Sequence, residues 1–372
     1  MIVTHLAKFY PPVKGGMELV VRSLCRSTAD RVENRVIAFH TSRTTRRETV
    51  EGIPVTRLGT IGRAGSVPVA AGLFGELQRL RSDLLVLHEP NPWALLACAL
   101  VRPRIPLVVW YHSDVVRPRL QYALFYAPMA NPVYARAARF VVSSPPLAEC
   151  AAALAPYRRR TDVVPFGIEL EALSPEPVMG RIQELRRRFE GRVVILAVGR
   201  MVPYKGFDVL LRSLEAVSAD LVLVGDGPRR AEWMALAQRL GLHDRVHFAG
   251  EAAPGELLAL YHACDIFVLP SITRAEAFGL VQVEAMACGK PVVSTRLPSG
   301  VPWVNQHEQT GLTVPPGDPA ALAAALRRLV DDPHLRAQFG EAGRARAHAE
   351  FRLDRMGERI LGVYESVLQE GR

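Results

Sequence analysis

Short apolar runs, each followed by a loop and then a helical pattern, recur along the chain and constrain its fold more than any other feature. The clearest are Leu84–Leu87, Leu107–Tyr111, Val193–Val198 and Ile266–Leu269. Runs of this length, bounded by Gly, Pro or charged residues, are typical of strands buried on both faces. Because buried strands that alternate with helices form parallel sheets, the sequence predicts an α/β protein.

The remaining strands and helices continue the same alternation. Further strands are expected at Ile2–Leu6, Val36–Phe39, Val55–Leu58, Phe140–Ser143, Asp162–Pro165, Leu221–Val224, Val246–Phe248 and Val292–Ser294, and late helices at Pro319–Val330 and Leu353–Leu368. The Pro- and Glu-containing stretch 173–180 resembles a linker between domains. We therefore expect two parallel-sheet domains, with a boundary at residues 172 and 173.

Charge and composition narrow the class of protein. The net charge is +9, and residues 1–170 hold 22 Lys and Arg against 12 Asp and Glu, so the basic excess belongs to the first half. A basic half can bind an anionic membrane surface, a phosphorylated acceptor or nucleic acid, but no nucleic-acid motif accompanies it. No apolar run reaches the roughly 18–20 residues of a membrane span, and the chain opens on a strand-like segment instead of a signal peptide. Together with cysteines that form no C-x-x-C pair, this favours a cytoplasmic protein.

Two carboxylates in the segment from Asp265 to Pro291 have a suggestive spacing. The pattern after the strand Ile266–Leu269 predicts a helix from about Ala277, with Glu276 at its start and Glu284 about two turns inside. The first amides of such a helix favour an anion such as phosphate. A capping Glu276 with a solvated Glu284 explains the same spacing.

Polar residues also follow strands in the first half. His88 and Glu89 follow one predicted strand, and His112 and Asp114 follow the next. Ligands of open parallel sheets bind outside the carboxyl ends of the strands, so substrate chemistry is expected there. Near the start of the chain, Gly15 and Gly16 could form a positive-φ turn that brings amides to a phosphate.

Several of these motifs resemble one enzyme family. E-A-F-G-L-V-Q-V-E, residues 276–284, is similar to the E-x7-E signature of retaining glycosyltransferases of the GT-B fold, family 4. G-R-M-V-P-Y-K-G at 199–206, V-P-F-G-I-E at 164–169 and H-S-D-V-V-R-P at 112–118 resemble further motifs of the family, the last one a subgroup that includes mannosyltransferases. The match extends over nearly the whole chain.

The resemblance implies a fold and a set of roles. It implies two Rossmann-like domains that face a central cleft: 1–172 for the acceptor and 173–353 for the nucleotide sugar, with a helix at 354–372 that crosses back to the first domain. Catalytic roles fall on His112, Arg200, Lys205 and Glu276: the two cations would hold the diphosphate, and Glu276 would hold sugar hydroxyls. Donor-binding roles fall on Gly15, Gly16, Gly199, Gly225, Phe248, Ala277, Phe278, Gly279, Leu280 and Glu284.

The implied reaction moves a hexose, by this resemblance mannose, from a nucleotide diphosphate sugar to a glycan or a polyprenyl-diphosphate-linked acceptor. Cell-surface polysaccharide or glycolipid synthesis is the expected setting. GDP-mannose is the first choice of donor and a UDP-sugar the second. No metal is expected, because the sequence has no D-x-D pair and its cations can stabilise the departing diphosphate.

Two other functions fit the same scaffold: a nucleotide-sugar epimerase, and a non-catalytic subunit that binds a sugar nucleotide. An NAD dehydrogenase fits less well, because G-D-G-P-R-R at 225–230 is not a G-x-G-x-x-G fingerprint.

The segment Val116–Phe140 suggests a location. Four arginines flank five apolar or aromatic residues there, a composition that suits the boundary between lipid headgroups and acyl chains: Arg117, Arg119, Arg136 and Arg139 with Tyr122, Phe125, Tyr126, Met129 and Tyr134. The hypothesis is a face that docks on the cytoplasmic side of an anionic membrane. The alternative is that these aromatic side chains are the ordinary core of a helix pair kinked at Pro128 and Pro132.

Overall fold

The computed structural model of the chain describes residues 1–13, 15–64, 67–114, 124 and 126–370. These residues cluster into two compact units: one is Met1–Gly167 with Leu353–Arg372, and the other is Ile168–Arg352. The chain first passes from one unit to the other after Gly167, five residues before the predicted boundary. The reason is local, since Ile168 N–H donates to Phe351 O at 2.9 Å and Ile168 pairs with Arg352, which holds residues 168–172 in the second unit.

The first unit is built on an eight-stranded sheet within the described residues. Its spatial order is β10-β9-β8-β7-β1-β2-β4-β3. The strands are β1 (Ile2–Leu6), β2 (Glu33–Phe39), β3 (Arg46–Val50), β4 (Ile53–Leu58), β7 (Leu84–Glu89), β8 (Leu107–Tyr111), β9 (Arg139–Val142) and β10 (Thr161–Val163). All neighbours pair in parallel except β3, an exposed strand that runs antiparallel to β4 at the edge. The polar, Arg-rich composition of β3 hid it from the strand pattern.

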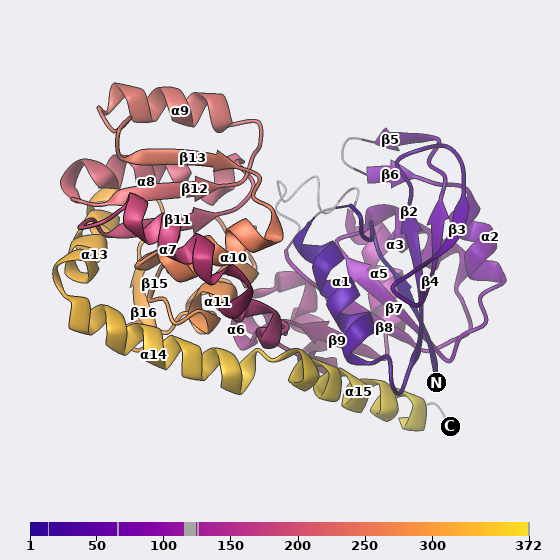
Figure 1. Cartoon of the computed structure of the whole chain (residues 1–372). Coiled ribbons are helices and arrows are strands. Elements are labelled where there is room, and N and C mark those ends of the chain that lie inside the picture. The colour runs from indigo at the N-terminus through magenta and orange to yellow at the C-terminus, as the bar shows by residue number, and fades with distance from the viewer. Residues whose placement is uncertain (14, 65–66, 115–123, 125, 371–372) are drawn as a thin grey trace. The chain divides into compact units, whose positions relative to one another are not determined.

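Helices surround this sheet (Figure 1). They are α1 (Gly16–Ser27), α2 (Gly72–Gln78), α3 (Pro92–Val101), α5 (Ala127–Arg136), α6 (Pro145–Cys150) and α15 (Leu353–Glu370), with a 3₁₀ segment at Ala152–Arg160 and a small ribbon of β5 (Gly62–Ala64) and β6 (Val67–Val69). The last helix, α15, packs on α1, and a Cβ at Gly357 would lie only 2.4 Å from Ser27 O. A glycine is therefore needed where these two helices meet.

The second unit has a six-stranded parallel sheet in the order β13-β12-β11-β14-β15-β16. Its strands are β11 (Val194–Val198), β12 (Asp220–Val224), β13 (Val246–Gly250), β14 (Ile266–Leu269), β15 (Val292–Thr295) and β16 (Gly311–Val314). Strand β16 was not predicted. Asn305, just before the strand in the chain, donates from its amide to Val292 O and to Leu312 O, each at 3.1 Å.

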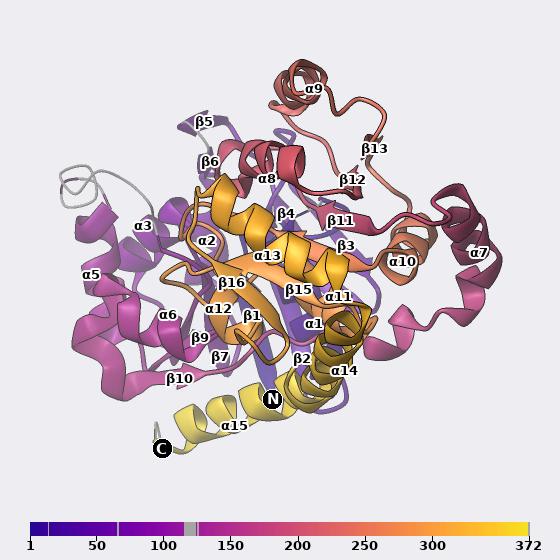
Figure 2. The ribbon, with the colours of Figure 1, turned by 90° about the vertical axis from the view of Figure 1, so that its left-hand side faces the viewer.

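The helices of the second unit connect these strands in turn. They are α7 (Met179–Arg188), α8 (Phe207–Ser213), α9 (Arg230–Arg239), α10 (Pro254–Ala263), α11 (Leu280–Ala287), α12 (Val301–Val304), α13 (Pro319–Asp331) and α14 (Pro333–Glu350), with 3₁₀ turns at Leu170–Leu173, Glu176–Val178, Pro203–Lys205 and Leu214–Ala216. Figure 2 shows α13 lying over β15 and β16, which it contacts.

Both sheets have a switch point, where the chain stops adding strands on one side of the first strand and begins to add them on its other side. In the first sheet it lies between β1 and β7, and in the second between β11 and β14. Loops diverge at the carboxyl ends of such strand pairs, and ligands bind there. The residues after these strands are therefore the first candidates for function.

Candidate active site

A buried ion pair lies at the switch point of the second sheet. Lys205, in the loop after β11, donates from Nζ to Glu276 Oε2 at 2.6 Å, and Ser271 Oγ donates to the same oxygen at 3.0 Å. The two charged side chains are only 10% and 11% exposed. The fold thus joins two predicted site residues that are 71 positions apart in the sequence.

Lys205 keeps its charge in this position. Burial alone lowers the pKa of its ammonium group, but the attraction of Glu276 and Tyr204 outweighs burial and raises the pKa above its ordinary value. A buried charge of this kind is stable only with a partner. Lys205 therefore stays cationic while Glu276 is in place.

Arg200 lies on the same loop and has a different environment. Its side chain is exposed, and its guanidinium forms no hydrogen bond or ion pair with any other residue that the structure describes. A guanidinium can hold a diphosphate through two parallel hydrogen bonds. The loop thus carries one partnered cation and one available cation.

The glycines of the strand-end loops permit close backbone contact. Gly225, after β12, has φ 126°, and a Cβ there would lie 2.1 Å from Gly199 O. Gly199 N–H in turn donates to Val224 O at 2.9 Å. A Cβ at Gly199 would lie 3.1 Å from the Lys205 side chain, so larger residues would displace this cation.

The prediction for the start of helix α11 was wrong. The helix begins at Leu280, and Gly279 precedes it in the left-handed region with φ 74°. Ala277 and Phe278 therefore lie in the loop, and Glu276 does not share a helix with Glu284. The side chain of Phe278 is buried against the Trp303 and Phe351 rings, with centroids 6.3 and 5.7 Å away. A local pattern could not reveal this packing.

Two further predicted donor-binding residues lie in or beside the core. Glu284 is on α11, where Tyr261 Oη donates to its Oε2 at 2.6 Å. Burial raises the pKa of Glu284, although this hydrogen bond opposes the rise. Phe248 lies inside β13 and packs against the core, because the strand continues past the predicted end to Gly250.

The expected positive-φ turn at Gly15 and Gly16 is also wrong. Gly15 is extended, with φ 172°, and Gly16 is the first residue of α1. A Cβ at Gly15 would lie 2.0 Å from Glu18 Oε2, because the carboxylate of Glu18 folds back over the start of the helix and bonds its own amide. This carboxylate occupies the position that an anion would otherwise take at α1.

In the first unit, three histidines form a row across the switch point. His112 Nε2 is 2.9 Å from His88 Nδ1, and His88 Nε2 is 3.1 Å from His5 Nδ1. All three rings are buried. Burial lowers the pKa of His112 to about 3 and of His5 to about 4, and that of His88 also falls well below its ordinary value. Sequence reasoning missed His5, whose only signal was an imidazole inside the apolar strand I-V-T-H-L.

Glu89 sits beside this row in an apolar environment. Burial raises the pKa of its carboxyl group to about 8, while a hydrogen bond from Tyr126 Oη opposes the rise. Its backbone oxygen accepts from His112 N–H at 3.0 Å, and Asp114 accepts from Tyr111 Oη at 2.8 Å. Near neutral pH the raised pKa of Glu89 favours the protonated form of its carboxyl group.

The proposed membrane-facing segment is partly core. Tyr126 and Tyr134 are buried, Met129 packs against the same core, and Arg139 pairs with Glu370. The core alternative therefore holds for Tyr126, Met129 and Tyr134, but α5 is one helix with Pro132 inside it and not a helix pair. Arg117, Arg119, Tyr122 and Phe125 lie outside the described residues.

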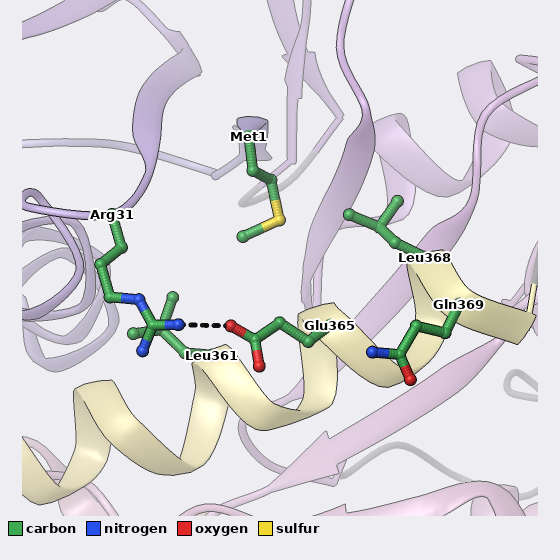
Figure 3. Close-up of a pocket in the computed structure, with 6 residues that line it drawn as sticks. All are labelled: Met1, Arg31, Leu361, Glu365, Leu368 and Gln369. Atoms are coloured by element: carbon green, nitrogen blue, oxygen red, sulfur yellow. Dashed lines mark hydrogen bonds and ion pairs between the residues drawn. The ribbon is translucent and has the colours of Figure 1, made fainter.

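In the part of the chain that the structure describes, no helix is long and apolar enough to span a bilayer, and no group of His, Cys, Asp and Glu is arranged to hold a metal ion. A small open pocket of about 300 Å³ lies between the chain start and α15 (Figure 3). Arg31 and Glu365 line it and bond each other across it, so it offers no free charge to a ligand.

The chain resembles known proteins over nearly its whole length. Residues 14–172 match the model of Glycosyltransferase Family 4, and residues 181–346 match that of Glycosyl transferases group 1. The chain is 32% identical to the D-rhamnosyltransferase WbpZ of Pseudomonas aeruginosa, covering 93% of this chain and 91% of that protein. It is 29% identical to the O-antigen chain mannosyltransferase C of Escherichia coli, covering 99% of each.

Solved structures share the fold. HepE of Anabaena, crystallised with UDP, superposes with a TM-score of 0.80 at 24% identity, covering 98% of this chain and 100% of that one. WaaG, a glycosyltransferase of lipopolysaccharide biosynthesis, gives 0.75 at 18% identity, covering 98% and 99%. The two parallel-sheet units therefore have the GT-B architecture, and this chain belongs to the family 4, group 1 glycosyltransferases.

Proposed function

We propose that this glycosyltransferase moves mannose, or a closely related hexose, from GDP-mannose to a glycan or lipid-linked acceptor, with retention at the anomeric carbon. The relatives support the sugar, because they are named as mannosyl- and rhamnosyltransferases. One that covers 54% of this chain, from Mycobacterium tuberculosis, is named as GDP-mannose-dependent. The O-antigen relative supports cell-surface polysaccharide as the setting.

The observation that carries the proposal is the buried Lys205–Glu276 pair with the available Arg200 on the same loop. When the glycosidic bond to the donor breaks, negative charge grows on the departing diphosphate. Lys205 and Arg200 are suited to stabilise it as it forms. We propose that these two cations take the place of a metal ion.

The carboxylates complete the donor site in this proposal. Glu276, held by Lys205 and Ser271, would accept hydrogen bonds from sugar hydroxyls. Glu284 would accept from ribose hydroxyls, oriented by Tyr261. The amides near Gly279 would contact phosphate oxygens. The retaining mechanism is carried by the family resemblance alone.

The proposal extends to the acceptor and the location. A polyprenyl-diphosphate-linked glycan would bring the enzyme to the cytoplasmic face of a membrane, and the basic first half would assist that binding. Among the arginines of this segment that the structure describes, Arg136 is the exposed one. Co-sedimentation with phosphatidylglycerol vesicles, for the wild type and for Arg117, Arg119 and Arg136 changed to Gln, should show salt-sensitive binding that the variant loses. Equal sedimentation at low salt would leave a soluble acceptor.

A donor panel tests the proposed function. GDP-mannose, GDP-rhamnose, UDP-glucose and UDP-galactose are each supplied with a mannose-terminated lipid-linked oligosaccharide, and release of nucleotide is measured with and without that acceptor. We expect acceptor-dependent release of GDP, and an α-linked product by NMR. A sugar change without acceptor would show an epimerase, and binding of the donor without turnover would show a non-catalytic subunit.

A further inference from the structure

We propose that Asn34, His5 and His88 form a hydrogen-bonded relay that fixes the tautomer of His112, with the proton on Nε2 and the lone pair on Nδ1. His112 then presents an acceptor to a hydroxyl group of the substrate. The contact between His112 and the substrate rests on the proposed function, whereas the tautomer of His112 is a property of the protein alone.

The relay runs across four buried side chains of neighbouring strands. His112 follows β8, His88 is on β7, His5 is on β1 and Asn34 is on β2, in the same order as the strands in the sheet. The successive contacts are 2.9 Å, 3.1 Å and, from His5 Nε2 to Asn34 Oδ1, 3.0 Å. Both nitrogens of His5 and both of His88 are used.

The direction of the relay is set at Asn34. One end of its amide faces Cys25 O at 3.1 Å, Val32 O at 3.4 Å and Thr28 Oγ1 at 3.0 Å. Carbonyl oxygens can only accept a hydrogen bond, so the atom that faces them is the amide nitrogen. The amide oxygen therefore faces His5.

The remaining protons follow one after another. Asn34 Oδ1 can only accept, so His5 Nε2 carries a proton. Burial keeps His5 neutral, which leaves its Nδ1 as an acceptor, and His88 must donate from Nε2. His88 is neutral for the same reason, so its Nδ1 accepts and His112 donates from Nε2.

The outer end of the relay is open. Nδ1 of His112 forms no hydrogen bond with any residue that the structure describes. The ring cannot turn freely, because Trp110 and Phe166 stack on it with centroids 5.8 and 5.6 Å away. Trp110 also stacks on His88, 5.9 Å away. The lone pair of Nδ1 is therefore held in one direction.

The relay is suited to orientation and not to proton transport. A proton that entered at His112 could pass to His88 and then to His5, but the next group is an amide that cannot release it. It would stop as a buried imidazolium with no carboxylate among its hydrogen-bond partners, which is costly. His5 and His88 are therefore positioning residues, and His112 alone would touch the substrate.

The tautomer can be measured directly on the full-length protein. In ¹⁵N-labelled enzyme, the chemical shifts and proton couplings of the imidazole nitrogens separate N–H from bare nitrogen, and a His112→Gln variant assigns the signals. We expect His112 to carry its proton on Nε2 in the absence of any substrate. A proton on Nδ1 in the wild type would overturn the relay.

Two variants of His88 provide a matched pair. Gln can accept from His112 with its oxygen and donate to His5 with its nitrogen, so His88→Gln should keep the tautomer. Phe can do neither, so His88→Phe would leave the Nε2 proton of His112 without an acceptor and should move it to Nδ1. We expect transfer to fall about tenfold in the Phe variant, the loss of about one good hydrogen bond, and less than threefold in the Gln variant.

A third variant acts from further away. His5→Phe leaves His88 Nε2 without an acceptor, so His88 should reverse and His112 should reverse with it, and this variant serves if His88→Phe does not fold. An unchanged tautomer in folded His5→Phe or His88→Phe would overturn the relay. An altered tautomer with unchanged transfer would show that His112 does not touch the substrate. The tautomer measurement does not depend on the donor, so it stands or fails separately from the proposed function.

Discussion

The change Glu276→Gln tests the buried ion pair most directly. It leaves Lys205 buried with a neutral acceptor in place of a carboxylate 2.6 Å away. Breaking a buried pair by removing one charge costs about 3–5 kcal/mol, and the lower end applies here because the Gln oxygen can still accept. For a unit of this size, the lower end of that range is a fall in melting temperature of roughly 6–12 °C.

The same change should strengthen nucleotide binding. A phosphate oxygen bonded to Lys205 would lie about 4–5 Å from the Glu276 carboxylate, and at an effective dielectric of about 20 this repulsion is about 3–4 kcal/mol. Without Glu276, a diphosphate becomes the only counter-charge for Lys205. We therefore expect GDP to bind at least tenfold more tightly to the variant, while sugar transfer is lost.

The assay combines thermal melting with a titration of GDP, because a ligand at about 100 times its dissociation constant stabilises by roughly 2.7 kcal/mol. The matched control is Glu284→Gln, which removes a half-buried carboxylate that has a hydroxyl donor and no cation partner among the described residues. Its melting temperature should change little. If Glu276→Gln melted like the wild type and bound GDP no more tightly, Lys205 would not depend on Glu276 and the assigned electrostatics would be refuted.

The remaining predictions use single measurements. Arg200→Ala should reduce transfer at saturating donor by at least tenfold with an unchanged melting temperature, because its guanidinium is exposed; more than half of wild-type turnover would remove it from the site. Chelator should leave activity intact, and a loss that Mg²⁺ or Mn²⁺ restores would refute metal independence. The free energy of unfolding should fall as the pH drops from about 6.5 to 5, because His5 and His112 bind a proton in the unfolded chain and stay neutral when buried. Each histidine should lower the free energy of unfolding by about 2 kcal/mol at pH 5, and urea unfolding across this pH range measures the change. Glu89 acts in the opposite direction: its raised pKa means that stability falls as pH rises from about 4.5 to 8, and Glu89→Gln should remove that decline in the same experiment.

Much of the architecture could be predicted from the sequence, because a strand buried on both faces has a composition that does not depend on its neighbours. The runs Leu107–Tyr111 and Ile266–Leu269 are strands with the predicted bounds. Strand β3 escaped this pattern because it is exposed at an edge, and β16 because Gly311 and Thr313 interrupt its apolar residues.

The contact between the two candidate site residues could not be predicted from the sequence. Family motifs pointed to Lys205 and Glu276, but only the tertiary structure shows that they neutralise each other. The order of strands places β11 beside β14, and no spacing along the chain contains that order.

The histidine relay illustrates the same division. The sequence by itself determined that imidazoles stand in or after three buried strands, at His5, His88 and His112. Tertiary structure decided that they meet, because β7 inserts between β1 and β8, and it decided which nitrogen carries each proton through Asn34. Chemistry is encoded residue by residue, whereas the direction of a hydrogen bond depends on which buried groups face each other after the sheet has formed.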